Sequence, residues 1–118
     1  MANIIRKTVT FDASGKIVGR LASNIASHLI GKTSPSYETN VDSGEFVKVT
    51  NADKMILTGK KMDQKVYQHH TAHPGGLRTK SLAQMWANDP TDVLRMAVSR
   101  MLPKTKHRKA RLMRLNIE

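Results

Sequence analysis

Three histidines stand within five positions of the segment YQHHTAHPGGLRTK, residues 67–80. They are His69, His70 and His73. Imidazole binds transition metals and serves as a general acid or base, so the close spacing of the histidines suggests either metal binding or acid–base catalysis. The pair Gly75-Gly76 and two cations follow, and no acid interrupts the run. Contact with an anion is therefore a third interpretation.

A metal site or a catalytic centre is weakly supported. Neighbouring residues of an extended strand point to opposite faces, so at most two of the three histidines converge easily. The chain has no cysteine, and further ligands would have to come from distant residues such as His28, Asp42 or Glu45. Acid–base catalysis needs a histidine oriented by a partner in a cleft, and no nucleophile motif lies nearby. We predict no catalytic residue, metal or cofactor, and keep a metal- or nucleotide-dependent enzyme as the alternative.

Anion contact fits the remaining features of the segment. The glycine pair would let the backbone approach a sugar-phosphate chain, and Thr71 and the histidines offer hydrogen bonds. Positive charge stands on both sides of the segment: Arg78 and Lys80 lie after the glycines, and Lys60, Lys61 and Lys65 lie before the histidines. An ordinary turn with solvated lysines is the alternative. Residues 31–34, GKTS, do not form a phosphate loop, because they follow a predicted helix instead of preceding it.

The distribution of charge favours a nucleic-acid partner. The 118 residues, expected to form one domain, carry a net charge of +11. Residues 1–92 hold twelve Lys/Arg and eight Asp/Glu, whereas residues 93–118 hold eight and one. A basic tail can also coat an anionic membrane, but no amphipathic aromatic face accompanies this one. We expect a soluble intracellular protein that binds neither a membrane nor a small-molecule substrate.

The C-terminal quarter supplies most of the excess charge. Lys104, Arg108 and Arg111 have the spacing of one helical face, and Lys106 and Lys109 broaden it. Arg95, Arg100 and Arg114 extend the positive field, with no acid between Val93 and Ile117. Since Ala110 and Met113 offer only a narrow apolar contact, we expect most of this segment to stay outside the core.

Hydrophobic periodicity predicts alternating strands and helices. Strands are expected at 8–13, 45–50 and 65–69, with a short final strand around Leu115 and Ile117. An amphipathic helix from Val18 to Leu29 ends at Gly31, and two further helices follow Ser81 and Asp89-Pro90. The later helix should bury Leu94, Ala97, Val98 and Met101 before Pro103 stops it. The pattern is that of an α/β domain in which helices cover a small sheet.

Several phrases together resemble one family, large-subunit ribosomal protein thirteen in its bacterial or organellar form. The matching stretches are DASGKIVGRLAS (12–23), the helix running to GK (31–32), VDSGEFVKVTNADKMILTGKK (41–61), KVYQHHTAHPGGLRTK (65–80), AVSRMLPK (97–104) and RLMRLNI (111–117). They cover nearly the whole chain in the family's order. Two departures are visible: Arg100 stands where the family usually has glycine, and the chain ends at Glu118 without the longer tail of many bacterial members.

This resemblance implies a three-layer α/β/α sandwich around a four-stranded, mainly parallel sheet, with a basic C-terminal extension. It also implies a structural, non-enzymatic role in the large subunit of a cytoplasmic or organellar ribosome, with an early part in assembly. The expected partners are large-subunit rRNA and neighbouring ribosomal proteins. The segments 69–80 and 101–114 are the implied rRNA contacts, and the turns at Lys16/Arg20 and Lys60/Lys61 are weaker candidates.

Overall fold

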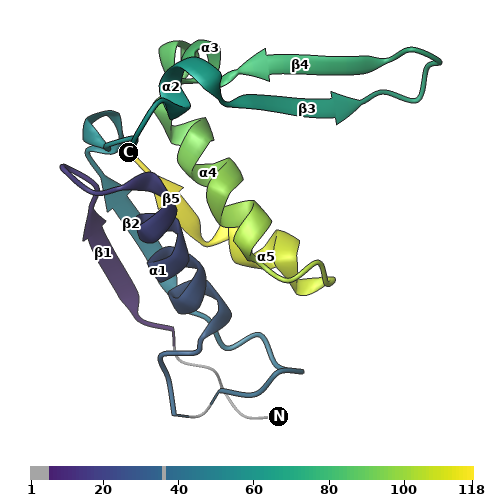
Figure 1. The fold of residues 1–118 in the computed structure, drawn as a ribbon. Coiled ribbons are helices and arrows are strands. Elements are labelled where there is room, and N and C mark those ends of the chain that lie inside the picture. The colour runs from purple at the N-terminus through teal and green to yellow at the C-terminus, as the bar shows by residue number, and fades with distance from the viewer. Residues whose placement is uncertain (1–5, 36) are drawn as a thin grey trace.

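The computed structural model describes residues 6–35 and 37–118, although the side chains of residues 61 and 62 lie outside the described part. Strands and helices alternate along much of the chain, which confirms the predicted α/β class (Figure 1). The elements are β1 (Thr8–Asp12), α1 (Val18–Ile30), β2 (Phe46–Thr50), the 3-10 helix η1 (Ala52–Lys54), α2 (Lys61–Gln64), β3 (Val66–His70), β4 (Leu77–Ser81), α3 (Leu82–Asn88), α4 (Pro90–Met101), α5 (His107–Met113) and β5 (Leu115–Ile117).

The central sheet has three parallel strands in the order β1-β2-β5. Val47 of β2 lies between Val9 and Leu115 in register, and the three apolar side chains share the sheet face that packs into the core. Thr10 and Asn116 belong to the opposite face and are exposed. In the described chain, α1 and α5 contact strands of the sheet, and α4 packs against these two helices.

The four-stranded, three-layer arrangement implied by the resemblance is not reproduced. Strand β3 pairs with β4 in a separate antiparallel hairpin, and Ile17 and Ile56 add only an isolated parallel bridge to the rest. A strand inside a parallel sheet needs apolar side chains on both faces. Residues 66–70 are VYQHH, of which only Tyr67 is buried, so this strand lacks the composition for such a position. The coarser expectation of a small, mainly parallel sheet is confirmed.

The ends of the helices follow the predicted caps. Gly31 ends α1 with a φ of 95°, a left-handed conformation that glycine adopts without a Cβ penalty. Ser81 and Gln84 form a capping box at the start of α3. Asp89 accepts a hydrogen bond of 3.0 Å from the Thr91 amide at the start of α4. Local sequence signals therefore set these boundaries as expected.

The core lies between α1, α4 and the inner face of the sheet. Its fully buried side chains include Ile25 and Leu29 of α1 and Leu94 and Val98 of α4. Met101 was expected to be buried with them, but 42% of it is exposed because it lies in the final turn of α4. No helix in the described ranges is long and apolar enough to cross a membrane.

Candidate nucleic-acid interface

The histidine segment lies on the hairpin of β3 and β4, which projects from the body of the molecule beyond α2 and α3 (Figure 1). The predicted strand at 65–69 is confirmed as β3. Its partner β4, with the sequence LRTKS, has no apolar alternation, so the sequence pattern does not predict it. Apart from Tyr67, the strand residues of the hairpin are exposed or half-buried, so polar side chains are tolerated on both faces.

The two faces of the hairpin differ in charge. Directly paired residues of an antiparallel hairpin point to the same face, and successive residues alternate. Tyr67 pairs with Lys80 and His69 pairs with Arg78, so one face carries both cations. The alternate pairs, Gln68 with Thr79 and His70 with Leu77, leave the other face without Lys or Arg. We call the first face, defined by Tyr67, His69, Arg78 and Lys80, the cationic face of the hairpin.

The glycines shape the tip of the hairpin. Gly75 has a φ of 72°, and a Cβ on Gly76 would lie only 1.8 Å from Oγ1 of Thr71. The Thr71 amide donates to the Gly76 carbonyl at 2.9 Å, and the Gly76 amide donates to the His73 carbonyl at 3.0 Å. The glycine pair therefore permits close packing within the tip itself, and the approach to a sugar-phosphate chain stays a prediction. The Gly76 amide is bonded within the tip and is therefore not free to donate to a ligand.

The three histidines of the segment occupy different places. His69 lies on the cationic face, His70 lies on the opposite face with Nδ1 2.5 Å from the Thr71 carbonyl, and His73 is exposed at the tip. The opposite orientations of the first two are as predicted. Within the described ranges, no three His, Cys, Asp or Glu side chains gather in the manner of a metal site. All three histidines remain candidates for hydrogen bonding or stacking with a nucleic acid.

The weaker candidates lie in turns of the main body. Lys16 is exposed in the turn before α1, and Arg20 is exposed in the first turn of that helix. Lys60 is exposed in the turn before α2. The side chain of Lys61 falls outside the described residues. The structure thus presents three of these four cations to solvent.

The C-terminal cations are less uniform than the sequence suggests. Lys104, Lys106 and Lys109 are exposed, and Arg95 forms an exposed ion pair with Asp92 at 3.6 Å. Arg108 reaches back to α4 and donates to Oγ of Ser99 at 2.6 Å. Lys104 precedes α5, which begins only at His107. The expected single helical face of Lys104, Arg108 and Arg111 is therefore wrong.

Arg111 and Arg114 face the interior instead of a ligand. Arg111 is only 3% exposed, with Nε 3.5 Å from Oδ1 of Asp42. Arg114 donates to both carboxylate oxygens of Asp42, at 2.8 and 2.7 Å. Because burial and ion pairing leave little of either guanidinium accessible, we do not retain Arg111 and Arg114 as proposed rRNA contacts. The segment also joins the core through Leu112, which the narrow apolar spacing does not predict.

Asp42 is the partner that makes this burial possible. Burial by itself would raise the pKa of Asp42, but the hydrogen bonds and charge of Arg114, together with Arg6 and Arg111, hold it below the ordinary 3.8. The carboxylate therefore stays ionised and neutralises cations that would otherwise be buried alone. The sequence shows Asp42 only as a loop acid far from either arginine, so no local signal identifies this role.

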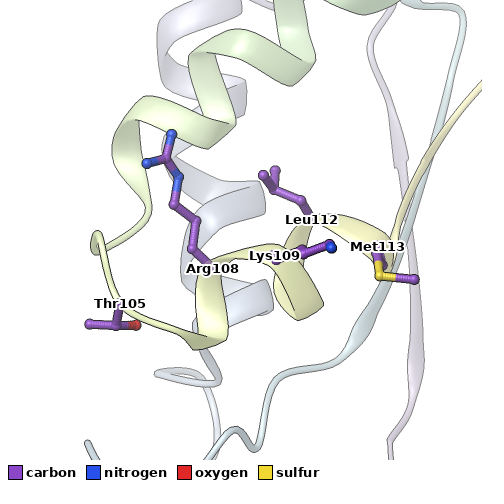
Figure 2. Close-up of a pocket in the computed structure, with 5 residues that line it drawn as sticks. All are labelled: Thr105, Arg108, Lys109, Leu112 and Met113. Carbon is purple, nitrogen blue, oxygen red and sulfur yellow. The ribbon is translucent and has the colours of Figure 1, made fainter.

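An open hollow lies on the exposed side of α5, with a volume of about 470 Å³. It is lined by Thr105, Arg108, Lys109, Leu112 and Met113. Figure 2 shows Arg108 extending toward α4, whereas Lys109 and Met113 extend the other way from α5. Met113 is 78% exposed, so apolar surface and positive charge stand together here. Exposed apolar surface next to positive charge is more typical of a surface that contacts another macromolecule than of a helix that faces only solvent.

The sequence model of the family described as "Ribosomal protein L13" matches residues 6–117. The chain belongs to the ribosomal protein L13 family. One curated member, the large ribosomal subunit protein uL13 of Thermotoga petrophila, is 49% identical over 112 residues, which cover 95% of this chain and 75% of that protein. The uL13 protein of Clostridioides difficile is 47% identical over 116 residues, covering 98% and 81%. That of Syntrophus aciditrophicus is 45% identical over 116 residues, covering 98% and 82%.

Membership in the ribosomal protein L13 family confirms the resemblance drawn from the separate phrases. The matched region includes the sheet, the hairpin and α5, so the family relationship extends to every surface described above. The cationic face of the hairpin and the exposed lysines around α5 carry accessible positive charge within the predicted segments.

Proposed function

We propose that this chain is a structural, non-enzymatic constituent of the large ribosomal subunit that binds large-subunit rRNA and supports subunit assembly and translation. Membership in the family supports the ribosomal role. The relatives are named as proteins of the large ribosomal subunit, and we extend that location to this chain, in a cytoplasmic or organellar ribosome. Neighbouring ribosomal proteins are further proposed partners.

The main structural support for the proposed rRNA binding is the projecting hairpin. No acid occurs between Gln64 and Asn88, and the hairpin places Arg78 and Lys80 on one exposed face. The cations of this face add little to the stability of the fold, because solvent-exposed charges contribute little to the free energy of unfolding. It does suit a phosphate backbone, where cations release condensed counterions on binding. His69 lies on the same face and can donate a hydrogen bond or stack on a base.

A second contact is proposed at the connection between α4 and α5. Lys104, Lys106 and Lys109 are exposed there, next to the hollow lined by Leu112 and Met113. Arg95 and Arg108 are weaker contributors because each already has a partner within the chain. Lys16, Arg20 and Lys60 are exposed and remain proposed peripheral contacts.

Sedimentation of a cell lysate tests the ribosomal role directly. With a tagged chain expressed in its host, most of the protein should sediment with the large subunit. If the chain instead sediments as free protein, a regulatory RNA- or DNA-binding protein would replace the proposal. Turnover of a nucleotide by the purified chain would support the enzymatic alternative.

Moving one charge across the hairpin tests its proposed interface. The double variant Arg78→Gln/Thr79→Arg keeps the net charge of +11 but transfers a guanidinium from the cationic face to the opposite face. We expect weaker binding to large-subunit rRNA fragments and a salt dependence reduced by about 0.7 to 0.9 in log–log slope, the value for one phosphate contact. Thr79→Arg alone is the matched control. Equal binding by the double variant and the wild type would contradict a one-sided interface.

A further inference from the structure

Tyr67 connects the projecting hairpin to the body of the protein. It is the one buried residue among the ten in β3 and β4. The guanidinium of Arg100 lies 5.1 Å from the centre of its ring, and the ammonium of Lys65 lies 5.4 Å from the same point. Both distances fall within the range of cation–π attraction. Two cations from different parts of the chain thus meet on one aromatic ring.

The packing around this ring is incomplete. Tyr67 and Arg100 both line a partly enclosed hollow of about 290 Å³, together with Val93, Ala97 and other apolar residues. Shape alone therefore does not fix the ring, as it would in a close-packed core. Burial raises the pKa of Tyr67 above its ordinary 10.0, against the opposing charge of Arg100, so the phenol stays neutral at physiological pH. A neutral ring keeps the face that attracts a cation.

We propose that Arg100 is a positioning residue, which holds Tyr67 against α4 and thereby fixes the direction in which the cationic face of the hairpin points. This inference rests on the proposed function, in which that face binds rRNA. Lys80 pairs directly with Tyr67 in the hairpin, so a displacement of Tyr67 away from α4 would move Lys80 and Arg78 with it. Arg100, in the last turn of α4, supplies the contact from the body.

This role differs from a direct rRNA contact, which the positive field of the C-terminal quarter suggests for Arg100. A phosphate contact needs only the charge and would be served by lysine. A planar guanidinium stacked on a ring covers it more completely than an ammonium does, so lysine should serve the positioning role only in part.

Distance measurements between two spin labels test the positioning role without RNA. The chain has no cysteine, so Asn24→Cys on the exposed surface of α1 and Thr79→Cys on the neutral face of the hairpin give one labelled pair. We expect a narrow distance distribution in the parent, a broad one with Arg100→Gln or Tyr67→Leu, and an intermediate one with Arg100→Lys. Lys104→Gln, which removes an exposed cation elsewhere, should leave the distribution narrow.

Binding of large-subunit rRNA fragments supplies the second measurement. Arg100→Gln should weaken binding more than Lys104→Gln does, although each removes one charge, because the first also frees the hairpin. A distribution unchanged by Arg100→Gln would overturn the positioning role, whatever the affinity. If the parent chain binds no rRNA, the proposed function fails, but the distance distributions still decide whether Arg100 holds the hairpin. Circular dichroism of each variant verifies that the helices remain folded.

Discussion

Arg114 donates two hydrogen bonds to the carboxylate of Asp42, at 2.8 and 2.7 Å, across 72 positions of sequence. The same guanidinium donates to the Leu29 carbonyl at 3.0 Å. Arg6 donates to the Gly44 carbonyl at 2.6 Å and to the Asp42 carbonyl at 3.0 Å. The loop before β2 is therefore tied to the end of α1, to the residue after α5 and to the residues before β1.

Asp42→Asn should destabilise the fold substantially. The change leaves Arg111 and Arg114 largely buried without a compensating negative charge. Removing an unpaired guanidinium from water costs free energy, which destabilises the folded state. We expect a loss of about 2 kcal/mol in the free energy of unfolding, less than for a fully buried pair. Urea unfolding measures it. Glu118→Gln is the control, because it breaks only the exposed pair with Lys48. A loss no larger than that of the control would contradict the assigned role of Asp42.

The stability contributed by Asp42 should depend on pH. Its pKa in the folded state is lowered below 3.8, so the folded chain binds a proton less readily than the unfolded chain does. The contribution is therefore complete above 3.8 and is lost as the pH falls through the lower, folded-state pKa. The difference in unfolding free energy between the wild type and Asp42→Asn should shrink between pH 5 and pH 2. Asp12 and Asp89, whose pKa values are also lowered, are present in both proteins, so their contributions cancel in this difference. A difference independent of pH would disprove this assignment.

Local signals predict much of the fold. The periodic apolar stripe of α1, the glycine at Gly31, and the capping residues Ser81 and Asp89 each act over a few residues, and the structure confirms all four. The pairing of β3 with β4 is harder to predict, because the hairpin buries little and so lacks an apolar pattern. A strand that stands in solvent leaves only its turn residues as a signal.

The candidate interface is predicted less completely because the sequence cannot distinguish an exposed arginine from one with an internal partner. Arg111 and Lys104 look alike in the basic segment, yet Arg111 is buried against Asp42 and Lys104 is exposed. The distinction depends on an acid 69 positions away from Arg111 in the chain. Tyr67 illustrates the same limit, since its contact with Arg100 joins β3 to α4.

Lys104→Ala should therefore affect rRNA binding, whereas Arg111→Ala should affect the stability of the fold. Lys104→Ala removes an exposed cation, so we expect unchanged stability and an rRNA salt-dependence slope reduced by about one unit or less. Arg111→Ala opens a buried site beside Asp42, and we expect a loss of about 2 kcal/mol in unfolding free energy. Thermal unfolding and filter binding at matched salt separate the two. If Arg111→Ala lowers only the salt slope, the side chain contacts rRNA and its burial is not structurally important.

Gly76→Val should disrupt the hairpin tip while α1 and α4 stay folded. Any Cβ at this position lies 1.8 Å from Oγ1 of Thr71 and 2.8 Å from the His73 carbonyl oxygen, distances that real Cβ atoms do not occupy. The tip must open, which misplaces His73 and weakens the rRNA contact proposed for the hairpin. Circular dichroism should show retained helices, and incorporation into large subunits should fall.

A second variant separates the shape of the tip from a general effect of substitution there. Gly76→Ala with Thr71→Ala removes the closest obstructing atom, Oγ1, but leaves the contact with the His73 carbonyl. We expect this pair to incorporate better than Gly76→Ala alone and less well than the wild type. Gly19→Ala is the control, since a Cβ there meets nothing within 4 Å. Normal incorporation of Gly76→Val would show that the tip tolerates opening, and that its shape does not govern binding.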